Sequence, residues 1–458
     1  MKPLRILDTT LRDGDQAAGF AFCCKKKAEL ALLLAEAGAD IVETGFPSSS
    51  PQDKQACIES AAALRGTSAA VAMMCRAKSE EIRETASILP ENGILHLTLP
   101  VSDEHREALL GISRTKLLAQ AKELISFAAG YAVVEAGCED ASCAESNFLH
   151  EYIGTVLEAG AGIVNYADTR GVLCPPQVKA AVESLNRQFP QFSTGEKVLS
   201  VHFHNDYGLA TANTLTAVQS GCGQAEMTVS GIGERAGNAS LEETAANLFA
   251  HAGIYQTVTN IKPEKLPELT RRFRKEAVLP ATPLSPLCGW NVNTHSAGIH
   301  QKGIEYSPDS YDSVTKNPPH IVLSRHSGKS GIRLAAKQYG VAEISERQLE
   351  TLFQFVKQTN TGTVSAARFF EQLRKLGLLK EPLQQESGIK WQTVQTVGID
   401  GHYRMYAEGL LSNGTVYRTE HSGSEPETLL KEIKQEAALL VRWMFRGGSS
   451  SFFSGEKR

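Results

Sequence analysis

Two histidines separated by one residue, His202 and His204, are the side chains whose types and spacing best fit metal chemistry. They lie in a strand-like run, residues 198–206, that is apolar at first and ends in Asn205 and Asp206. Residues two apart in a strand point to the same face, with Cα atoms about 6–7 Å apart, so both imidazoles can reach one cation. A second polar cluster, residues 8–16, closes another strand-like run. Together these patterns predict an enzyme with a divalent metal ion.

The elements that position these clusters alternate regularly in the first part of the chain. Short apolar runs cover residues 5–9, 41–46, 69–75, 94–100, 131–136, 162–167, 199–203 and 224–230. Between them lie amphipathic segments such as 25–37 and 115–129, whose apolar residues recur at helical spacing. Eight β/α units in about 250 residues are typical of a (β/α)8 TIM barrel, an α/β fold. A doubly wound open sheet is the alternative, but the first turn is charged and poor in glycine.

Polar residues gather at the carboxyl ends of these predicted strands, where the active sites of such barrels lie. Arg12 and Asp13 follow the first strand, Arg76 follows the third, and His96 lies near the end of the fourth. Glu139 follows the fifth strand, and Asp168 and Thr169 follow the sixth. His202 and His204 lie at the end of the seventh strand, and residues 231–238 follow the eighth. Charged residues placed at random would not favour one end of every strand. The pattern therefore predicts one active site at the mouth of the barrel.

The chain is long enough for one large domain and smaller ones. We predict a catalytic barrel in residues 1–256, a small, mostly helical subdomain in residues 257–384 and a short α+β tail domain in residues 385–458. The tail has strand-like runs at 391–397, 403–411 and 415–419 and a closing helix at 425–444. Its glycine- and serine-rich end, residues 447–458, is expected to fray.

Composition narrows the class of partner. A net charge of −4 favours neither nucleic acid nor an anionic membrane surface. We find no apolar stretch of the length of a signal peptide or of a membrane span. Nine scattered cysteines are typical of reduced thiols, and we assign them no chemistry. The sequence predicts a cytoplasmic enzyme that acts on small molecules.

Six motifs make the chain similar to a known family. They are LDTTLRDGDQ (7–16), ETGFPSSSP (43–51), VHFHND (201–206), GIGERAGN (231–238), GIHQ (298–301) and RHSG (325–328). In this order they resemble the α-isopropylmalate synthase and homocitrate synthase family, and the second and fourth are most similar to the isopropylmalate synthase branch. The resemblance covers about residues 4–335. It implies a barrel enzyme that condenses acetyl-CoA with a 2-oxo acid and releases CoA.

The resemblance also implies a metal site. Asp13, His202 and His204 match the family's ligands, and Asn238 matches a position near the metal that can add an amide oxygen. One carboxylate and two imidazoles suit Zn, Mn, Co or, less well, Mg, so the ligand set does not choose the ion. The metal is expected to act as a Lewis acid on the carbonyl of the 2-oxo acid.

The resemblance assigns four residues to catalysis. Arg12 is expected beside the reacting carbonyl, where its charge would stabilise the developing alkoxide. Glu139, His300 and Tyr311 match positions that help to remove a methyl proton from acetyl-CoA. Which of the three takes the proton is left open. In the family, residues at the positions of His300 and Tyr311 reach the active site of a partner subunit, which implies a homodimer.

The expected acceptor pocket contains both matches and departures. Thr169 is expected to bind the carboxylate of the 2-oxo acid, and His96, Asn165 and Arg76 are expected to line the pocket. Arg170 stands where family members commonly have valine, so it either turns inward to hold a second anion or outward as a solvated charge.

Two further departures concern the walls of the pocket. Gly137 stands where the family usually has serine, which enlarges or reshapes one wall. Glu135 replaces the arginine with which homocitrate synthases bind a distal carboxylate, which argues against 2-oxoglutarate as the acceptor.

Several functions remain open at this point. Within the synthase class, 2-oxoisovalerate is the leading acceptor, and the dianions oxaloacetate (a Re-face citrate synthase) and phosphonopyruvate are alternatives. A hydroxyacyl-CoA lyase would need a catalytic cysteine in residues 231–238, which contain none. A biotin-dependent carboxyltransferase would carry a biotin site, which is lacking, and a non-catalytic regulator would not need the retained ligands. Residues 389–445 are too short for the regulatory domain of leucine-inhibited relatives.

Overall fold

The computed structural model describes residues 2–277, 284–287, 289, 292, 294–306, 320–358, 363–364, 366–379, 389–399, 402–411, 416–423, 427, 430–431 and 433–434. The chain divides into two compact units, Met1–Leu279 and Pro280–Arg458. Each unit is described by itself below. The predicted three-domain division stays a prediction.

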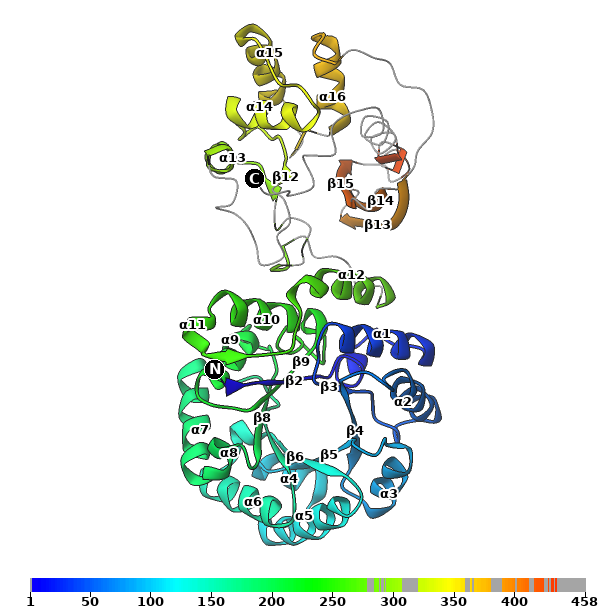
Figure 1. Ribbon diagram of the computed structural model, residues 1–458, viewed down its shortest axis with the longest axis vertical. Helices are drawn as coiled ribbons and strands as arrows, with labels where there is room; N and C mark the ends of the chain where they lie inside the picture. Colours follow the sequence, from blue (N-terminus) through cyan, green and yellow to red (C-terminus); the bar gives the residue numbers. More distant parts are fainter. Residues whose placement is uncertain are drawn as a thin grey trace. The chain divides into compact units, whose positions relative to one another are not determined.

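The first unit is built around a closed barrel of eight parallel strands (Figure 1). The strands are β2 (Arg5–Asp8), β3 (Ile41–Glu43), β4 (Ala70–Arg76), β5 (Ile94–Pro100), β6 (Val133–Glu139), β7 (Ile163–Asp168), β8 (Val198–Phe203) and β9 (Gln224–Met227). Each strand pairs with the next one along the chain, and β9 pairs with β2 to close the ring. The predicted (β/α)8 barrel is confirmed, and the open sheet is excluded.

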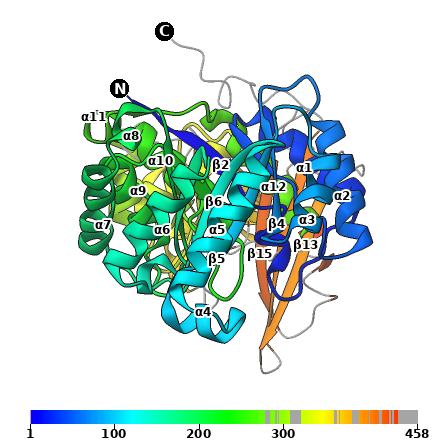
Figure 2. The same ribbon diagram turned by 90° about the horizontal axis from the view of Figure 1, so that it is seen from below.

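Helices surround the ring of strands on its outer side. They are α1 (Cys24–Glu36), α2 (Pro51–Ala63), α3 (Ser79–Ile88), α4 (Asp103–Leu110), α5 (Arg114–Ala129), α6 (Ser146–Glu158), α7 (Pro175–Gln188), α8 (Pro190–Thr194), α9 (Ala210–Gln219), α10 (Leu241–Ala250) and α11 (Ala252–Tyr255). In Figure 2, α5 lies against β5 and β6. Because helices cover the outside and side chains fill the inside, the strands read as nearly continuous apolar runs.

Local sequence explains where several of these helices begin. Ser50 accepts a hydrogen bond from the backbone N–H of Asp53, and Pro51 occupies the first helical position of α2. Ser102, Ser113 and Ser240 cap α4, α5 and α10 in the same way. A serine cap satisfies a backbone donor that the first turn of a helix leaves unpaired. These starts hold the loops above the strands in fixed positions.

The inside of the barrel is divided between an apolar floor and a polar mouth. Leu7, Ile41, Ala72, Ile94 and Ile163 form a buried cluster at the amino-terminal side of the strands. Above this floor the buried inward-facing side chains are polar or charged, namely Glu43, His96, Glu135, Asn165, Ser200, His202, Gln224 and Glu226. Buried polar groups need partners. The carboxyl ends of the strands are therefore the place to look for chemistry.

The first unit extends past the eighth β/α repeat. A short strand β1 (Lys2–Pro3) pairs in parallel with β10 (Thr257–Val258), outside the barrel. The helix α12 (Leu266–Glu276) packs on α1. The sequence analysis did not predict this short sheet, because two-residue strands leave no periodicity to read.

The second unit holds a helical cluster and an antiparallel sheet. Its elements are β11 (Thr294–His295), α13 (Gly298–Tyr306), β12 (His320–Ile321), α14 (Lys329–Gln338), α15 (Glu346–Lys357), α16 (Ala366–Lys375), β13 (Ile389–Ile399), β14 (His402–Leu411) and β15 (Val416–Gly423). The three predicted strands of the tail correspond to β13–β15, which form one sheet. Most of the predicted closing helix and all of residues 447–458 lie outside the described residues.

None of the helices in the described part of the chain combines the length and the apolar character that a membrane span requires.

Candidate active site and metal centre

The first turn after β2 places Arg12 and Asp13 over the mouth of the barrel. The carbonyl oxygen of Thr9 accepts hydrogen bonds from the backbone N–H groups of Arg12, Asp13 and Gly14. These bonds close a tight turn directly at the carboxyl end of the strand. Asp15, three residues after Arg12, binds the ammonium of the buried Lys27 at 2.7 Å and ties the turn to α1.

His202, on β8, and His204, which follows the last residue of β8 and forms an isolated bridge with Asn238, reach the same mouth. The two side chains point to one face because they are two residues apart in an extended segment. Their Nε2 atoms face each other at 3.2 Å, and the Nε2 of His202 lies 3.6 Å from Oδ2 of Asp13. All three residues are buried, and one ligand atom from each lies within 4.8 Å of the others. The sequence-predicted triad is thus assembled in space.

The geometry of this triad fits a bound cation. Two nitrogen ligands of a tetrahedral ion with bonds of about 2.0–2.1 Å lie about 3.3 Å apart, close to the separation of these two imidazoles. The Nδ1 of His202 is paired with Glu226 at 3.0 Å, which leaves Nε2 as the free ligand atom. The Nδ1 of His204 and the Oδ1 of Asn238 are buried without a hydrogen-bond partner. Unsatisfied buried atoms of this kind are costly unless a ligand satisfies them.

The protonation states of His204 and Asp13 also suit a metal, whereas at His202 burial is outweighed by Glu226 and Asp13, which raise the pKa of this imidazole. Burial and the neighbouring His202 lower the pKa of His204 to about 4, so its imidazole is neutral at physiological pH. Burial opposes ionisation of Asp13, but Arg12 and the two histidines outweigh it and hold the pKa of this carboxyl below its usual value. Metal ligands must be deprotonated to bind. Asp13 and His204 meet that condition before any ion arrives.

Asn238 lies beside Asp13 on the loop after β9. Its Nδ2 donates to Oδ1 of Asp13 at 3.0 Å and to the carbonyl of Ile232 at 3.2 Å. Gly233 has to lack a side chain, because a Cβ there would collide with the Asn238 amide and lie 2.9 Å from Asp13. In this arrangement Asn238 orients the carboxylate of Asp13. Its predicted role as a direct metal ligand stays a prediction.

Arg12 is a fixed cation next to the triad. Its Nε donates to Glu43 at 2.6 Å and its Nη1 to Asp13 at 2.8 Å. Burial opposes the charge, but Glu43, Asp13 and Glu226 raise the pKa of Arg12 above its ordinary value. The guanidinium therefore stays charged in the water-poor mouth of the barrel, where charge acts most strongly on a reacting oxygen.

A second set of buried polar groups lies around His96. The Nδ1 of His96 pairs with Glu43 at 2.7 Å. Burial opposes protonation, but Glu43 and more distant carboxylates raise the pKa of His96 to about 9. Glu135 accepts two hydrogen bonds from Gln224, at 2.9 and 3.0 Å, and burial with the charge of Glu226 raises its pKa to about 7.

Asn165 belongs to the same network. Its amide donates to Glu226 and, at 3.5 Å, to Ser200. Sequence reasoning had placed His96 and Asn165 in the pocket but had missed Glu43, Glu226 and Gln224. The signal that could have found the two glutamates is a carboxylate at an inward-facing position of a strand that is otherwise apolar.

The loops after β6 and β7 form a third group, around Asp140. Its backbone N–H donates to Oγ1 of Thr169 at 2.8 Å, so the hydroxyl proton of Thr169 is left for another acceptor. Asp140 itself is buried and accepts three hydrogen bonds from Arg170, at 2.7, 3.0 and 3.1 Å. Arg170 also binds Glu104 at 2.7 Å. The guanidinium of Arg170 is therefore bound by two carboxylates of this chain, those of Asp140 and Glu104.

Glu139 and Arg76, the remaining predicted residues of the first unit, have partners other than the triad. Glu139 is half-buried at the end of β6, where it pairs with His105 at 3.1 Å. Arg76 is exposed and bound to Glu81. His300 belongs to the second unit, where it is exposed and stacks on His295 at a ring distance of 6.2 Å. Tyr311 lies outside the described residues.

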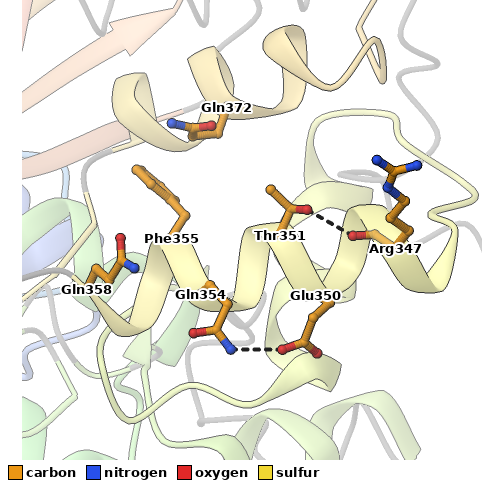
Figure 3. Close-up of a pocket in the computed structure, with 7 residues that line it drawn as sticks. All are labelled: Arg347, Glu350, Thr351, Gln354, Phe355, Gln358 and Gln372. Carbon is orange, nitrogen blue, oxygen red and sulfur yellow. Dashed lines mark hydrogen bonds between the residues drawn. The ribbon is translucent and has the colours of Figure 1, made fainter.

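The second unit carries a pocket of a different kind, between α15 and α16 (Figure 3). It is lined by Arg347, Glu350, Thr351, Gln354, Phe355, Gln358 and Gln372. Gln354 donates to Glu350 at 2.8 Å, and Thr351 donates to the carbonyl of Arg347 at 2.9 Å. We assign this pocket no chemistry.

Two protein-family models match the barrel and the segment that follows it. The HMGL-like family model matches residues 3–272, and the homocitrate synthase post-HMGL domain-like model matches residues 287–363. A 2-isopropylmalate synthase from Listeria monocytogenes is 34% identical over 364 residues, covering 78% of this chain and 70% of that protein. A protein from Methanopyrus kandleri, provisionally named (R)-citramalate synthase, is 36% identical over 76% of this chain and 67% of its own length.

Solved structures agree on the fold. The HMG-CoA lyase of Bacillus subtilis is 19% identical, with a TM-score of 0.54, and the match covers 61% of this chain and 95% of that one. At this identity the likeness concerns the barrel and not its chemistry. Taken with the matches above, the barrel and its motifs place this chain in the HMGL-like family, among the acyl-CoA condensing synthases related to isopropylmalate and homocitrate synthases, and the protein is an enzyme of that class.

Proposed function

We propose that the protein condenses acetyl-CoA with a 2-oxo acid in a reaction that depends on a divalent metal and releases CoA. The observation that carries the proposal is the buried Asp13–His202–His204 triad with the fixed charge of Arg12 2.8 Å from one of its ligands. The bound ion would polarise the keto group of the acceptor as a Lewis acid. Asp13, His202 and His204 would hold it, with Asn238 as neighbour or fourth ligand.

The chain's own residues divide the remaining steps. A base removes one proton from the acetyl methyl group, and the resulting enolate carbon forms a C–C bond to the keto carbon of the acceptor. Arg12 stabilises the negative charge that moves onto the keto oxygen. Water then cleaves the thioester and releases CoA as the thiol. Glu139, His300 and Tyr311 are the candidate bases, and the choice among them stays open.

We infer that the acceptor carries one carboxylate, bound by Thr169, and that 2-oxoisovalerate is the best candidate. Two observations support a monoanion. Arg170 is already bound to Asp140 and Glu104, and the interior around His96 contains the carboxyl groups of Glu43, Glu135 and Glu226. A second carboxylate on the acceptor would have to compete for the cations Arg12 and His96, which already pair with Glu43. The relatives named as 2-isopropylmalate synthases favour the same choice.

The first experiment measures thiol release from acetyl-CoA with Mn or Mg across five acceptors. They are 2-oxoisovalerate, pyruvate, oxaloacetate, 2-oxoglutarate and phosphonopyruvate. We expect the highest kcat/KM with 2-oxoisovalerate and none after the metal is removed. A preference for a dianion would overturn the acceptor assignment, and thiol release from metal-free protein would overturn the role of the triad.

We further propose that the enzyme is a homodimer in which His300 and Tyr311 complete the site of the partner subunit. Mixing two inactive variants tests this arrangement. His202→Ala inactivates the barrel site and His300→Ala inactivates the second unit, so a mixed dimer would regain one intact site. Recovery of activity after subunit exchange is expected. Continued inactivity, with exchange verified by mass, would argue for sites contained within single chains.

A further inference from the structure

The wall of the barrel beside His96 has an unusual pair of neighbours, Thr98 on β5 and Gly137 on β6. The two residues are in register across the parallel strands. Both belong to the inward-facing series of their strands, because Thr98 follows the inward-facing His96 by two residues and Gly137 follows Glu135 by two. They lie one step nearer to the mouth than His96 and Glu135.

Thr98 occupies the space that a side chain on Gly137 would need. A Cβ on Gly137 would lie 2.6 Å from Oγ1 of Thr98, 3.3 Å from its Cβ and 3.2 Å from Nε2 of His96. Only the contact with Oγ1 is shorter than 3.0 Å, so the Thr98 hydroxyl is the main obstacle, and Thr98→Ala would remove it. A hydroxyl-bearing side chain therefore fits at one of the two positions and not at both.

The Thr98 hydroxyl is also available. The side chain is half-buried, and in the described part of the chain its oxygen makes no hydrogen bond. The Nδ1 of His96 pairs with Glu43 and the amide of Asn165 with Glu226, while the Nε2 of His96 lies beside this wall, 3.2 Å from the position of a Cβ on Gly137. A half-buried hydroxyl without a partner, facing the mouth of an active-site barrel, is a free donor for a ligand.

We propose that Thr98 is an acceptor-binding residue that supplies, from β5, the hydroxyl that a serine at position 137 would supply from β6. Gly137 makes this exchange possible by removing the side chain that would collide with it. The Thr98 hydroxyl donates a hydrogen bond to an oxygen of the 2-oxo acid. The pocket wall is therefore reshaped rather than enlarged. This inference rests on the proposed function for its substrate, but its steric part stands without it.

The steric part is tested on metal-free protein by thermal denaturation of Gly137→Ser, Thr98→Ala and the double variant. We expect Gly137→Ser to lower the melting temperature by several degrees and the double variant to recover most of that loss. Gly162→Ala is the matched control, because a Cβ there meets only an ordinary contact at 3.4 Å. Additive effects of the two substitutions would show that the positions do not exclude each other and would overturn the inference.

The binding part is tested by steady-state kinetics with 2-oxoisovalerate as the varied substrate. Thr98→Val, which keeps the shape and removes the hydroxyl, is expected to raise the KM for the acceptor about tenfold, the loss typical of a hydrogen bond to a charged group. The KM for acetyl-CoA should not change, and Thr98→Ser should restore acceptor binding. Gly137→Ser combined with Thr98→Ala should come within about threefold of the wild type, because the hydroxyl returns from the other strand.

The outcomes separate this inference from the proposed function. If Thr98→Val leaves the acceptor KM unchanged while the wild type turns over, Thr98 does not bind the acceptor and the inference fails alone. If the wild type releases no thiol with any acceptor, the proposed function fails. The melting temperatures of the two single variants and the double variant then still test the steric claim. Additive shifts in melting temperature would reject the exchange of the hydroxyl between the two strands.

Discussion

Among the described residues the barrel holds two buried groups of three potential metal ligands, Asp13–His202–His204 and His96–Glu135–Glu226. They look alike in residue type and burial, but their hydrogen bonds differ. In the first group the Nε2 atoms of both histidines face each other, and the Nδ1 of His204 has no partner. In the second group each residue is bound by a neighbour, Glu135 by Gln224, His96 by Glu43 and Glu226 by Asn165.

Asp13 and His202 also have partners, so one unsatisfied side chain, His204, and not residue type, distinguishes the proposed metal site from the second group. Glu226 links the two groups because it accepts a hydrogen bond from Nδ1 of His202 at 3.0 Å. A carboxylate behind a histidine fixes the tautomer that can bind a metal. The second group is therefore best understood as the structure that orients the first. The predictions below test this distinction.

The largest effect is expected at the triad itself. His202→Ala removes one ligand and leaves Glu226 without its partner, so we expect loss of stoichiometric Mn or Zn binding by calorimetry and a fall in thiol release of at least about a thousandfold. His150→Ala, in the helical layer, is the control and should change neither. Full metal occupancy in His202→Ala would show that the triad is not the metal site.

Arg12→Lys distinguishes charge from geometry beside the triad. Lysine keeps the charge but lacks the planar fork that reaches Glu43 and Asp13 together. We expect kcat to fall about a hundredfold, in line with the loss of one group that stabilises a developing oxyanion, while the metal still binds. Equal loss of metal affinity and kcat would instead place Arg12 among the residues that build the triad.

Arg170→Val tests whether the charges around Asp140 serve substrate choice or structure. The buried Asp140 would lose three hydrogen bonds. Because Arg170 is partly exposed, we expect a loss in unfolding free energy of only about 1 kcal/mol, seen as a lower urea midpoint. The ranking of the five acceptors should not change. A selective loss of activity toward a dianionic acceptor would restore the interpretation of Arg170 as a substrate residue.

The smallest effect concerns Glu135 and pH. Because burial and Glu226 raise the pKa of Glu135 to about 7, this group binds protons in the folded state that it has released in the unfolded state. It therefore lowers stability progressively between about pH 4.5 and 7, and fully above that range. Glu135→Gln should gain stability relative to the wild type on going from pH 5 to pH 8, while metal affinity stays within about threefold. An unchanged difference across this range would show that Glu135 does not titrate there.

Much of the fold follows from local patterns. Eight apolar runs separated by amphipathic segments predicted the barrel, and all eight are strands, although β3 ends at Glu43 and β9 at Met227, before the predicted ends of both runs. Strands covered on both sides leave a strong apolar signal, whereas the turns that end them do not. The pair β1 and β10 was missed because four residues far apart in sequence make it.

The residue types at the mouth of the barrel follow from the sequence alone: a carboxylate and an arginine after β2, and two histidines two residues apart at the end of β8. Alternation along a strand is enough to bring His202 and His204 together. Which groups surround them follows only from the tertiary structure, because Glu43 comes from β3 and Glu226 and Gln224 come from β9, on the two sides of β2 in the ring. The tertiary structure likewise decided that Arg170 is bound to Asp140 and that Thr98 fills the space beside Gly137. The reason is physical: closure of the barrel sets distances between strands, and no pattern along one strand encodes those distances.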